Sequence, residues 1–373
     1  QGFNIGVGMR IRYIYLTDQS RQLAQKIKSS LSKDYWFDIG LDYEKGLEAE
    51  IISYSEFKAE SGTYFKESDC LVFIMASGIV VRSIAGHLVD KFKDPAVLVV
   101  DELGINVISL LSGHMGGAND FCRRIASSIG ANPVITTATD INNKGAFDML
   151  VKKMWANVDN LRDLSLLINS DLLKGVDIQL YIDPDYREYF EEDDLRGFSL
   201  VDQVKNLTSV DRNMEKNIDV KIQTRYDKIV ISDKLDLCRL AEEEGLVLVV
   251  PRRNVLGIGC RKNTDPKVFE EEVLSYLSQA NIDVRSIGRL GSIDLKMNEI
   301  CIGEFSSKYG IMCEFFAPED LAAYHDIYEK SEFVKKITGV YSVAQPACHI
   351  LAGGRLLGEM YRDKGITLAL GRR

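Results

Sequence analysis

Apolar runs and amphipathic stretches alternate along the first third of the chain. Residues 70–75 (CLVFIM) and 96–100 (AVLVV) are continuous apolar runs, a pattern typical of strands buried on both faces of a sheet. Between Leu23 and Leu31 apolar side chains recur every four residues, which predicts an amphipathic helix over 18–31. This alternation predicts an α/β domain at the N-terminal end.

The order of elements predicts that this first sheet is mixed. A four-residue turn, 101–104, ends in glycine, so residues 105–111 are expected to form a hairpin with the strand before the turn. A glycine-rich loop, a helix over about 118–129 and a short strand at 134–135 follow. A further helix is expected to run from Ser77 to about Asp90. We place the N-terminal domain at 9–148.

The last third, 251–373, restarts the α/β pattern as a second domain with a mixed sheet. Asp265 followed by Pro266 is a strong helix start, and that helix is expected to reach about Gln279. Strands are predicted at 255–258, 284–287, 311–315 and 366–370, with a turn at 259–264 and helices near 319–329 and 342–352.

The middle segment, 149–250, is the least clearly patterned part. It contains the acidic run 188–194 (EYFEEDD), which we interpret as solvated surface, because uncompensated charge blocks seldom bind a metal. Strands are predicted at 228–231 and 246–250. The expected fold is therefore two α/β domains joined by a more variable middle α/β segment.

Composition excludes several classes of function. The chain has 373 residues, 46% hydrophobic and 27% charged, with a net charge of −9 and no basic stripe, so nucleic acid is not expected as a partner. No apolar run approaches the roughly 18 residues that cross a bilayer, so we expect no membrane contact and a cytoplasmic location. Seven single cysteines without a Cys-x-x-Cys pair predict reduced thiols and no protein-bound metal.

The segment 110–120 (LLSGHMGGAND) carries the strongest candidate chemistry. It places Gly113, His114, Gly116 and Gly117 between a strand and a helix, with Asn119 following. Glycines allow the backbone to approach a ligand and present N–H groups to an anion or oxyanion. The alternative is a tight strand-to-helix turn capped by the histidine.

Polar residues at the ends of two buried strands form further candidates. Ser77, Gly78 and Arg82 begin a helix where the arginine can bind a carboxylate, although an exposed arginine on an ordinary helix is the alternative. Asp101 and Glu102 are a carboxylate pair suited to acid/base chemistry, whereas turns also favour aspartate for structural reasons.

Other polar positions give weaker signals. Thr136 and Thr137 follow a short strand and are candidates for a polar ligand or a helix cap, and Gly259 with Arg261 can hold an anion or form a plain turn. The remaining histidines lack metal-ligand spacing, so we interpret them as structural: His87, His325 and His349.

In this order the segments closely resemble the CbiG family of cobalamin biosynthesis proteins. The resemblance covers nearly the whole chain and is weakest over 150–250, which varies in the family. It rests on ASGIVVRSIA at 76–85, VDE-x-G at 100–104, LLSGH-x-GGAN at 110–119, PVITTATD at 133–140, GIGCR at 257–261 and GV-x-SVA at 339–344.

The resemblance implies an enzyme of the anaerobic cobalamin pathway. Water would open the ring A δ-lactone of cobalt-precorrin-5A, and acetaldehyde would leave to give cobalt-precorrin-5B. On residue chemistry we assign His114 as general base, Asp101 or Glu102 as the group that orients or relays its proton, and the 113–117 backbone as the oxyanion contact. Cobalt would arrive in the substrate, with no cofactor held by the protein.

A corrinoid with many carboxylates should meet local positive charge, for which the candidates are Arg82, Lys91, Arg261 and Arg289. Two other functions stay open: a corrinoid carrier without catalysis, and a nucleotide- or S-adenosylmethionine-dependent transferase, which the lack of a Rossmann glycine pattern disfavours. The sequence also leaves a homodimer open.

Overall fold

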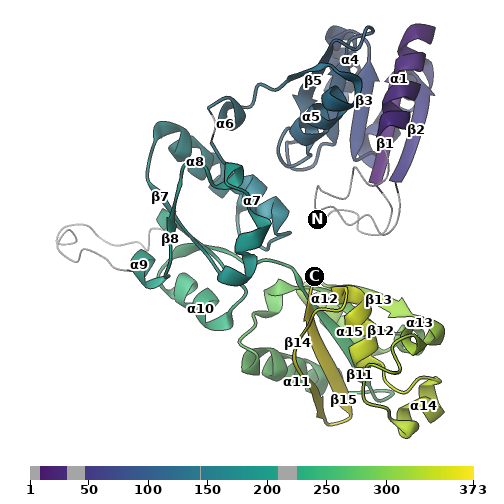
Figure 1. Ribbon diagram of the computed structural model, residues 1–373, viewed down its shortest axis with the longest axis vertical. Coiled ribbons are helices and arrows are strands. Elements are labelled where there is room, and N and C mark those ends of the chain that lie inside the picture. The colour runs from purple at the N-terminus through teal and green to yellow at the C-terminus, as the bar shows by residue number, and fades with distance from the viewer. Residues whose placement is uncertain (1–8, 32–46, 143, 209–224) are drawn as a thin grey trace, which may run out of the picture. The chain divides into compact units, whose positions relative to one another are not determined.

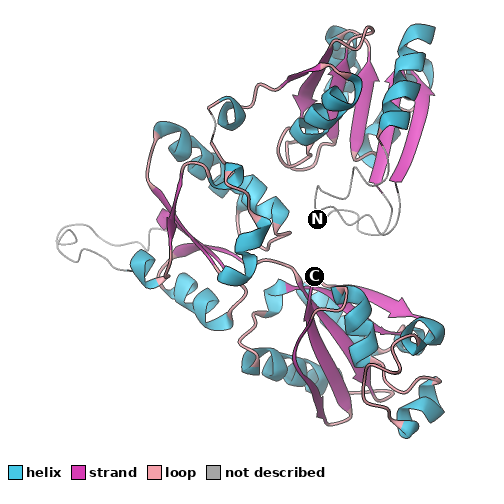
Figure 2. Cartoon of the chain, in the orientation of Figure 1, coloured by secondary structure: helices cyan, strands magenta, loops and turns pink. Residues whose placement is uncertain are grey.

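The computed structural model describes residues 9–31, 47–142, 144–208 and 225–373 (Figures 1 and 2). The chain divides into two compact units, which are described separately. The first runs to Met149 and includes Asp193–Arg196, and the second comprises the remainder from Leu150 onward.

A mixed sheet forms the first unit, as predicted. In the described residues its order is β2-β1-β3-β4-β5-β6, with β1 to β4 parallel, β5 antiparallel to β4, and β6 parallel to β5. The bounds are β1 (Met9–Tyr15), β2 (Leu47–Ser53), β3 (Cys70–Ile74), β4 (Ala96–Val100), β5 (Asn106–Leu111) and β6 (Asn132–Val134).

Helices cover both faces of this sheet. One layer contains α1 (Asp18–Ser30) and α5 (Ala118–Ile129), and the other contains α2 (Tyr54–Ala59), α3 (Ser61–Glu67) and α4 (Ser77–Ile84). Val72 packs in the first core and Phe73 in the second. Because successive strand residues face opposite sides, both layers need apolar side chains, which explains the unbroken apolar run of β3.

The helix expected to reach Asp90 is shorter than predicted. Regular helix ends at Ile84, and a 3-10 turn, Ala85–His87, continues it. The Val89 N–H then donates to the Asp94 carboxylate (2.9 Å), so the following chain folds as a closed loop. Gly86, which gains least from helix formation, lies at the break. The unit continues through α6 (Ala138–Ile141) towards α7 (Phe147–Lys153).

Within the second unit, the middle region forms a parallel sheet of order β10-β9-β7-β8. Its acidic run is solvated as expected, with Glu188, Glu191 and Glu192 exposed. The elements are α8 (Leu161–Lys174), β7 (Ile178–Ile182), a 3-10 helix (Pro184–Tyr189), β8 (Phe198–Val201), α9 (Lys205–Thr208), β9 (Arg225–Ile231), α10 (Leu235–Glu243) and β10 (Leu246–Val249).

The C-terminal region adds a mixed sheet of order β13-β12-β11-β15-β14, in which β15 runs antiparallel to both of its neighbours. The strands are β11 (Asn254–Cys260), β12 (Ile287–Ile293), β13 (Met312–Phe316), β14 (Leu356–Asp363) and β15 (Ile366–Arg372). The helices are α11 (Pro266–Gln279), α12 (Ile300–Tyr309), α13 (Pro318–Ala322), α14 (Glu332–Thr338) and α15 (Ala344–Ala352).

Several predicted boundaries in this region are wrong. Residues 284–286 form a 3-10 turn rather than a strand, because the Asp283 carboxylate accepts the Arg285 N–H (2.8 Å) and holds the chain in a turn. Gly259 belongs to β11, where it pairs with Thr367, and not to the following turn. The helix expected near 319–329 ends at Ala322. The sequence interpretation missed α12, α14 and β14.

Glycines let α15 lie directly on the C-terminal sheet. A Cβ on Gly257 would fall 1.8 Å from the Ala344 carbonyl oxygen, and one on Gly291 would fall 2.8 Å from the Leu351 side chain. Both positions therefore require glycine for steric reasons. This close packing holds α15 against one face of β11 and β12.

Arg372 joins the middle and C-terminal sheets. Its guanidinium is 1% exposed and donates to Asp233 (2.6 Å), Asp185 (2.6 Å) and Asn254 (3.0 Å). Asp185 follows β7 and Asp233 follows β9, the two strands between which the middle sheet changes winding direction. Ligands of doubly wound sheets bind at such a point, and here the chain's own arginine fills it.

Candidate active site

A hollow of about 470 Å³ opens at the carboxyl edge of the N-terminal sheet. The ends of β1, β3 and β4 and the start of α4 border this hollow. Its lining is apolar and its rim is polar. Its residues are Leu16, Thr17, Ile74, Met75, Ala76, Ser77, Ile79, Val99, Asp101, Glu102 and Ile108.

The sheet topology explains the place of this hollow. The chain leaves β1 for α1 on one face, and it leaves β3 for α4 on the other face. Neighbouring parallel strands whose connections diverge leave a crevice beyond their carboxyl ends, the usual ligand site of open α/β sheets. Ser77, Asp101 and Glu102, all predicted from the sequence, meet at this crevice.

The start of α4 supplies groups that favour an anion. The first helical bond runs from the Ile79 N–H to the Ala76 carbonyl (3.0 Å), so the N–H groups of Ser77 and Gly78 precede the bonded part of the helix. Arg82 is exposed and folds back, with its guanidinium 3.5 Å from where a Cβ on Gly78 would stand. Helix start and guanidinium together suit a carboxylate or oxyanion.

The two carboxylates of the hollow differ in their surroundings. Asp101 accepts backbone N–H bonds from Leu103 (3.1 Å), Ile105 (3.1 Å) and Asn106 (2.6 Å), which close the β4–β5 turn. Burial works to raise the pKa of Asp101, but the bonds from Ile105 and Asn106 outweigh it, so this pKa is lowered. Asp101 is therefore suited to holding the turn and poorly suited to accepting a proton.

Glu102 is the more accessible carboxylate. Its side chain is exposed at the rim and accepts a hydrogen bond from the Thr17 hydroxyl, which also lines the hollow. Thr17 also starts α1 as its N-cap, so the position of this hydroxyl is set by the helix.

His114 lies in a different cluster. Its Nε2 is 3.0 Å from Asp140 and 3.1 Å from the Thr139 hydroxyl, and its Nδ1 is 3.4 Å from Asp148. Burial disfavours the charged ring, but the hydrogen bonds that the ring donates to Asp140 and Asp148 outweigh it and raise the pKa of His114 to about 9. The imidazole is therefore charged at neutral pH, whereas the predicted general base requires a neutral ring.

The structure does not bring His114 to Asp101 and Glu102. In the antiparallel β4–β5 pair, Leu111 lies opposite Val97 at the start of β4, whereas Asp101 follows Val100 at its end. The loop after β5 therefore lies at the edge of the sheet opposite the hollow, about 13 Å away at some 3.3 Å per residue. The predicted proton relay from His114 through either carboxylate is geometrically wrong.

The other predicted residues of the glycine loop gather around Asn119. Its amide donates to the Thr137 hydroxyl (3.0 Å) and to Asp140 (2.9 Å). A Cβ on Gly113 would lie 2.8 Å from this amide, and Gly117 has a φ of +84°. These contacts indicate a tightly built turn. Gly116 packs against Ser112 in the same loop, and Thr136 is exposed.

The remaining predicted cations lie apart from the hollow. Lys91 is exposed, with its ammonium 4.9 Å from the centre of the Phe92 ring. In the second unit Arg261 packs against Gly365, close to Gly259, while Arg289 is buried in an ion pair with Glu314.

Each of the other histidines has a hydrogen-bond partner within its own unit. The His87 Nε2 is 2.9 Å from the Ser61 hydroxyl, and the His349 Nδ1 is 2.6 Å from the Tyr328 hydroxyl. His325 accepts the Tyr341 N–H (3.4 Å).

Sequence reasoning missed Thr17, Asp140 and Asp148. Thr17 was visible only as a helix start, and Asp148 lies 34 residues from His114 without any spacing signal. No group of three or more histidine, cysteine or acidic side chains suited to a metal ion occurs among the residues that the structure describes. Within the same ranges, no helix is long and apolar enough to span a membrane.

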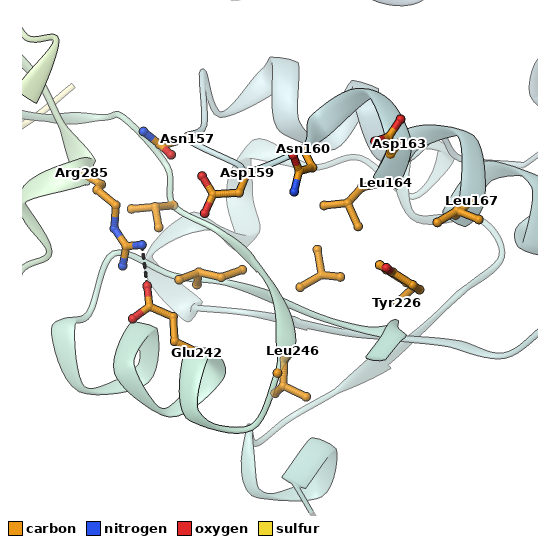
Figure 3. A pocket seen from close by; sticks show the side chains of 14 residues that line it. Asn157, Asp159, Asn160, Asp163, Leu164, Leu167, Tyr226, Glu242, Leu246 and Arg285 are labelled. Carbon is orange, nitrogen blue, oxygen red and sulfur yellow. Dashed lines mark hydrogen bonds and ion pairs between the residues drawn. The ribbon is translucent and has the colours of Figure 1, made fainter. Parts of the chain in front are cut away.

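A second hollow, of about 310 Å³, lies in the middle region and was not predicted (Figure 3). The start of α8, with Asn160 and Asp163, faces the edge strand β10 across it. The ion pair between Arg285 and Glu242 (2.6 Å) closes one side. Its lining is acidic overall, which does not suit a substrate rich in carboxylates.

The fold and the first hollow define an α/β protein whose sheet switch point carries a hollow suited to an anionic small molecule. Comparison with known families narrows this class. The model "Cobalamin synthesis G N-terminal" matches residues 61–140, which contain the β3–α4 and β4–β5 connections, and "Cobalamin synthesis G C-terminus" matches residues 254–371.

Curated relatives agree with these matches. The chain is 36% identical over 307 residues to "Cobalt-precorrin-5A hydrolase" of Salmonella typhimurium, covering 82% of this chain and 83% of that protein. It is 29% identical to the protein of the same name from Priestia megaterium, covering 82% and 79%. A crystal structure of a cobalamin biosynthesis protein G homolog from Sulfolobus solfataricus is 20% identical over 97% of this chain and 96% of that one, with a TM-score of 0.39. On the 36% identity to the Salmonella typhimurium protein and the two family models, the chain belongs to the CbiG family.

Proposed function

We propose that this protein is the hydrolase that converts cobalt-precorrin-5A to cobalt-precorrin-5B and releases acetaldehyde. The observation that carries the proposal is the 36% identity, over most of both chains, to a curated cobalt-precorrin-5A hydrolase. The two family models at either end of the chain support it.

The N-terminal hollow suits such a substrate. A cobalt-bearing tetrapyrrole has an apolar ring edge and many carboxylate arms, and the hollow joins an apolar lining to the anion-favouring start of α4. Large apolar side chains on the loops at this edge, Leu16, Leu103 and Ile105, are 46%, 70% and 51% exposed. Exposed apolar groups around a polar site are typical of ligand surfaces.

Different residues of the hollow would carry different steps of the reaction. Glu102 would take a proton from the attacking water, while the Ser77 and Gly78 N–H groups and Arg82 would stabilise the oxyanion at the lactone carbonyl. After ring opening, the hydroxyl of the departing two-carbon group gives up its proton. The C–C bond then breaks, with its electron pair passing to the macrocycle, and acetaldehyde leaves. Cobalt enters as part of the substrate, and no protein-held cofactor takes part.

The test is an anaerobic incubation with cobalt-precorrin-5A, with acetaldehyde followed through an NADH-coupled alcohol dehydrogenase and the corrinoid by mass spectrometry. We expect one acetaldehyde per corrinoid. The Glu102→Gln variant should lower kcat roughly 10²- to 10⁴-fold, as loss of a general base does. Glu67→Gln, which changes an exposed glutamate on α3, is the matched control.

Two outcomes would contradict the proposal at different levels. Tight corrinoid binding without aldehyde would mean that the chain is a carrier and not a hydrolase. Full activity in folded Glu102→Gln would leave the hydrolase intact and remove the assigned base.

A further inference from the structure

Hydrogen bonds at the start of α1 saturate the Ser20 hydroxyl. This side chain is buried, and its oxygen accepts the backbone N–H groups of Leu16 (3.0 Å) and Thr17 (2.8 Å). It donates its own proton to the Thr17 carbonyl oxygen (2.9 Å). Because a hydroxyl has one proton and two acceptor lone pairs, these three bonds use the full hydrogen-bonding capacity of Ser20.

The saturated Ser20 hydroxyl determines where the Thr17 proton goes. As the N-cap of α1, the Thr17 side-chain oxygen accepts the Ser20 N–H (3.2 Å). It also lies 3.2 Å from the Ser20 hydroxyl oxygen, but that oxygen has no lone pair left to accept another proton. The Thr17 hydroxyl therefore donates to the Glu102 carboxylate, its remaining acceptor among the residues that the structure describes.

Glu102 depends on this one bond for its orientation. Its side chain is exposed, and within the described ranges it forms no second hydrogen bond or ion pair. An exposed glutamate without a partner samples several rotamers, which place its carboxylate at different points. The Thr17 bond engages Oε1 of Glu102, selects the rotamer in which Glu102 lines the hollow, and leaves Oε2 available.

The donor itself is held rigidly. The Thr17 N–H and carbonyl are both bound to Ser20, and the carbonyl also accepts the Arg21 N–H (2.9 Å) at the first turn of α1. Thr17 follows β1 and Glu102 follows β4, the strands on either side of β3, so the bond links two separate connections of the sheet. A catalytic group is best positioned by a partner whose own conformation is fixed.

We propose that Thr17 is a positioning residue for the hydrolase: its hydroxyl holds the Glu102 carboxylate in the orientation that takes a proton from the attacking water. This role rests on the proposed function, which makes Glu102 the general base. A hydrogen bond donated to a carboxylate also favours the charged form that a base requires. Thr17 acts through Glu102 and touches no reacting atom.

The test compares three substitutions of Thr17 in the full-length protein with the acetaldehyde assay. Thr17→Val removes the hydroxyl and should lower kcat about 10-fold with little change in KM, the low end for a hydrogen bond to a charged group because Glu102 is exposed. Thr17→Ser keeps the hydroxyl and should retain most of the wild-type kcat. Thr17→Asp still caps α1 but has no proton to donate at neutral pH, so it should keep the wild-type Tm and lose kcat as Thr17→Val does.

A role for Thr17 as a helix cap alone would give different results. Thr17→Asp would then be fully active, and this outcome would overturn the proposal even where Thr17→Val is too unstable to assay. The matched control is Ser53→Ala, which removes the N-cap of α2 outside the hollow and should lower the Tm while leaving kcat unchanged.

The pH dependence of kcat/KM gives a second readout. In Thr17→Val the acid limb should move to higher pH, because the carboxylate has lost a bond that favours its charged form, whereas Ser53→Ala should leave the limb in place. An acid limb that stays in place in Thr17→Val would contradict the positioning role.

A double-mutant cycle distinguishes failure of this proposal from failure of the proposed function. Because Thr17 acts through Glu102, adding Thr17→Val to Glu102→Gln should lower kcat no further. Independent, additive losses would overturn the positioning role and leave the hydrolase in place. A wild-type protein that releases no acetaldehyde would remove the hydrolase, and the role of Thr17 with it.

Discussion

The charged state of His114 gives the sharpest prediction about the most recognisable loop of this chain. Its pKa rises from an ordinary 6.5 to about 9 because Asp140 and Asp148 flank the ring. Since each pKa unit corresponds to 1.36 kcal/mol, the pair of carboxylates stabilises the folded state by about 3 kcal/mol while the ring is charged. A group with a raised folded pKa contributes fully below its unfolded pKa. Its contribution therefore declines from about pH 6.5 and is lost as the pH rises through about 9.

The measurement is a pH titration of the histidine Cε1–H resonances, assigned for His114 by its loss in His114→Gln. The Tm of both proteins is measured in parallel at pH 6 and pH 9.5. We expect the His114 resonance to titrate near pH 9, and the Tm gap between wild type and variant to be large at pH 6 and nearly closed at pH 9.5. His114→Gln should lose stability at neutral pH.

The reasoning about His114 fails if its resonance titrates below pH 7, since the ring would then be neutral in the cell and free to act as a base. It also fails if His114→Gln keeps the wild-type Tm at pH 6 while hydrolysis stops. Such a result would return the histidine to the catalytic role first suggested by its loop.

Three further predictions concern the second unit and the β4–β5 turn. Arg372→Met should destabilise the second unit by about 3–5 kcal/mol, because it leaves a buried carboxylate without its partner. Arg362→Met, which removes an exposed ion pair, should cost at most about 1 kcal/mol. Urea unfolding followed by Trp155 fluorescence measures both variants, and equal unfolding midpoints would refute the argument. Gly257→Ala should abolish folding or lower the Tm strongly, because the new Cβ would collide with a carbonyl oxygen. Gly303→Ala in α12 should instead raise the free energy of unfolding by about 0.5–1 kcal/mol. A Gly257→Ala protein with an unchanged Tm would show that α15 can move. Asp101→Asn should lower the Tm at pH 7 but hardly at pH 2. Because the folded protein lowers the pKa of Asp101, the charged carboxylate stabilises the fold above the ordinary aspartate pKa, and this stabilisation is lost as the pH falls through the folded pKa. An equal loss of Tm at both pH values would contradict a stabilising role for the Asp101 charge.

Most elements of the N-terminal and C-terminal sheets were predictable from local pattern. The runs at β3 and β4 had to be strands covered on both faces, and Asp265-Pro266 set the start of α11 as expected. Boundaries failed where side chains competed with the local pattern. Asp283 turns residues 284–286 into a 3-10 helix, and β14 becomes a strand only because β15 lies beside it.

The sequence indicated the individual residues of the candidate site, but it did not indicate how they are arranged in space. The hairpin between β4 and β5 was expected, and it already implies that His114 and Asp101 lie at opposite edges of the sheet. Sequence spacing did not show which side chain lies next to each of these polar groups in the fold. Asp148 beside His114, and Thr17 beside Glu102, come from distant parts of the chain.

The sequence by itself determined the α/β class, the identity of the family and the loops that hold polar groups, because apolar periodicity and motif order are local properties of the chain. Only the tertiary structure decided the state of each group. It made Asp101 a turn residue, left Glu102 exposed and placed a charged His114 between two carboxylates. The physical reason is that a pKa, and hence a chemical role, depends on burial and on neighbouring charges, which long-range folding brings together.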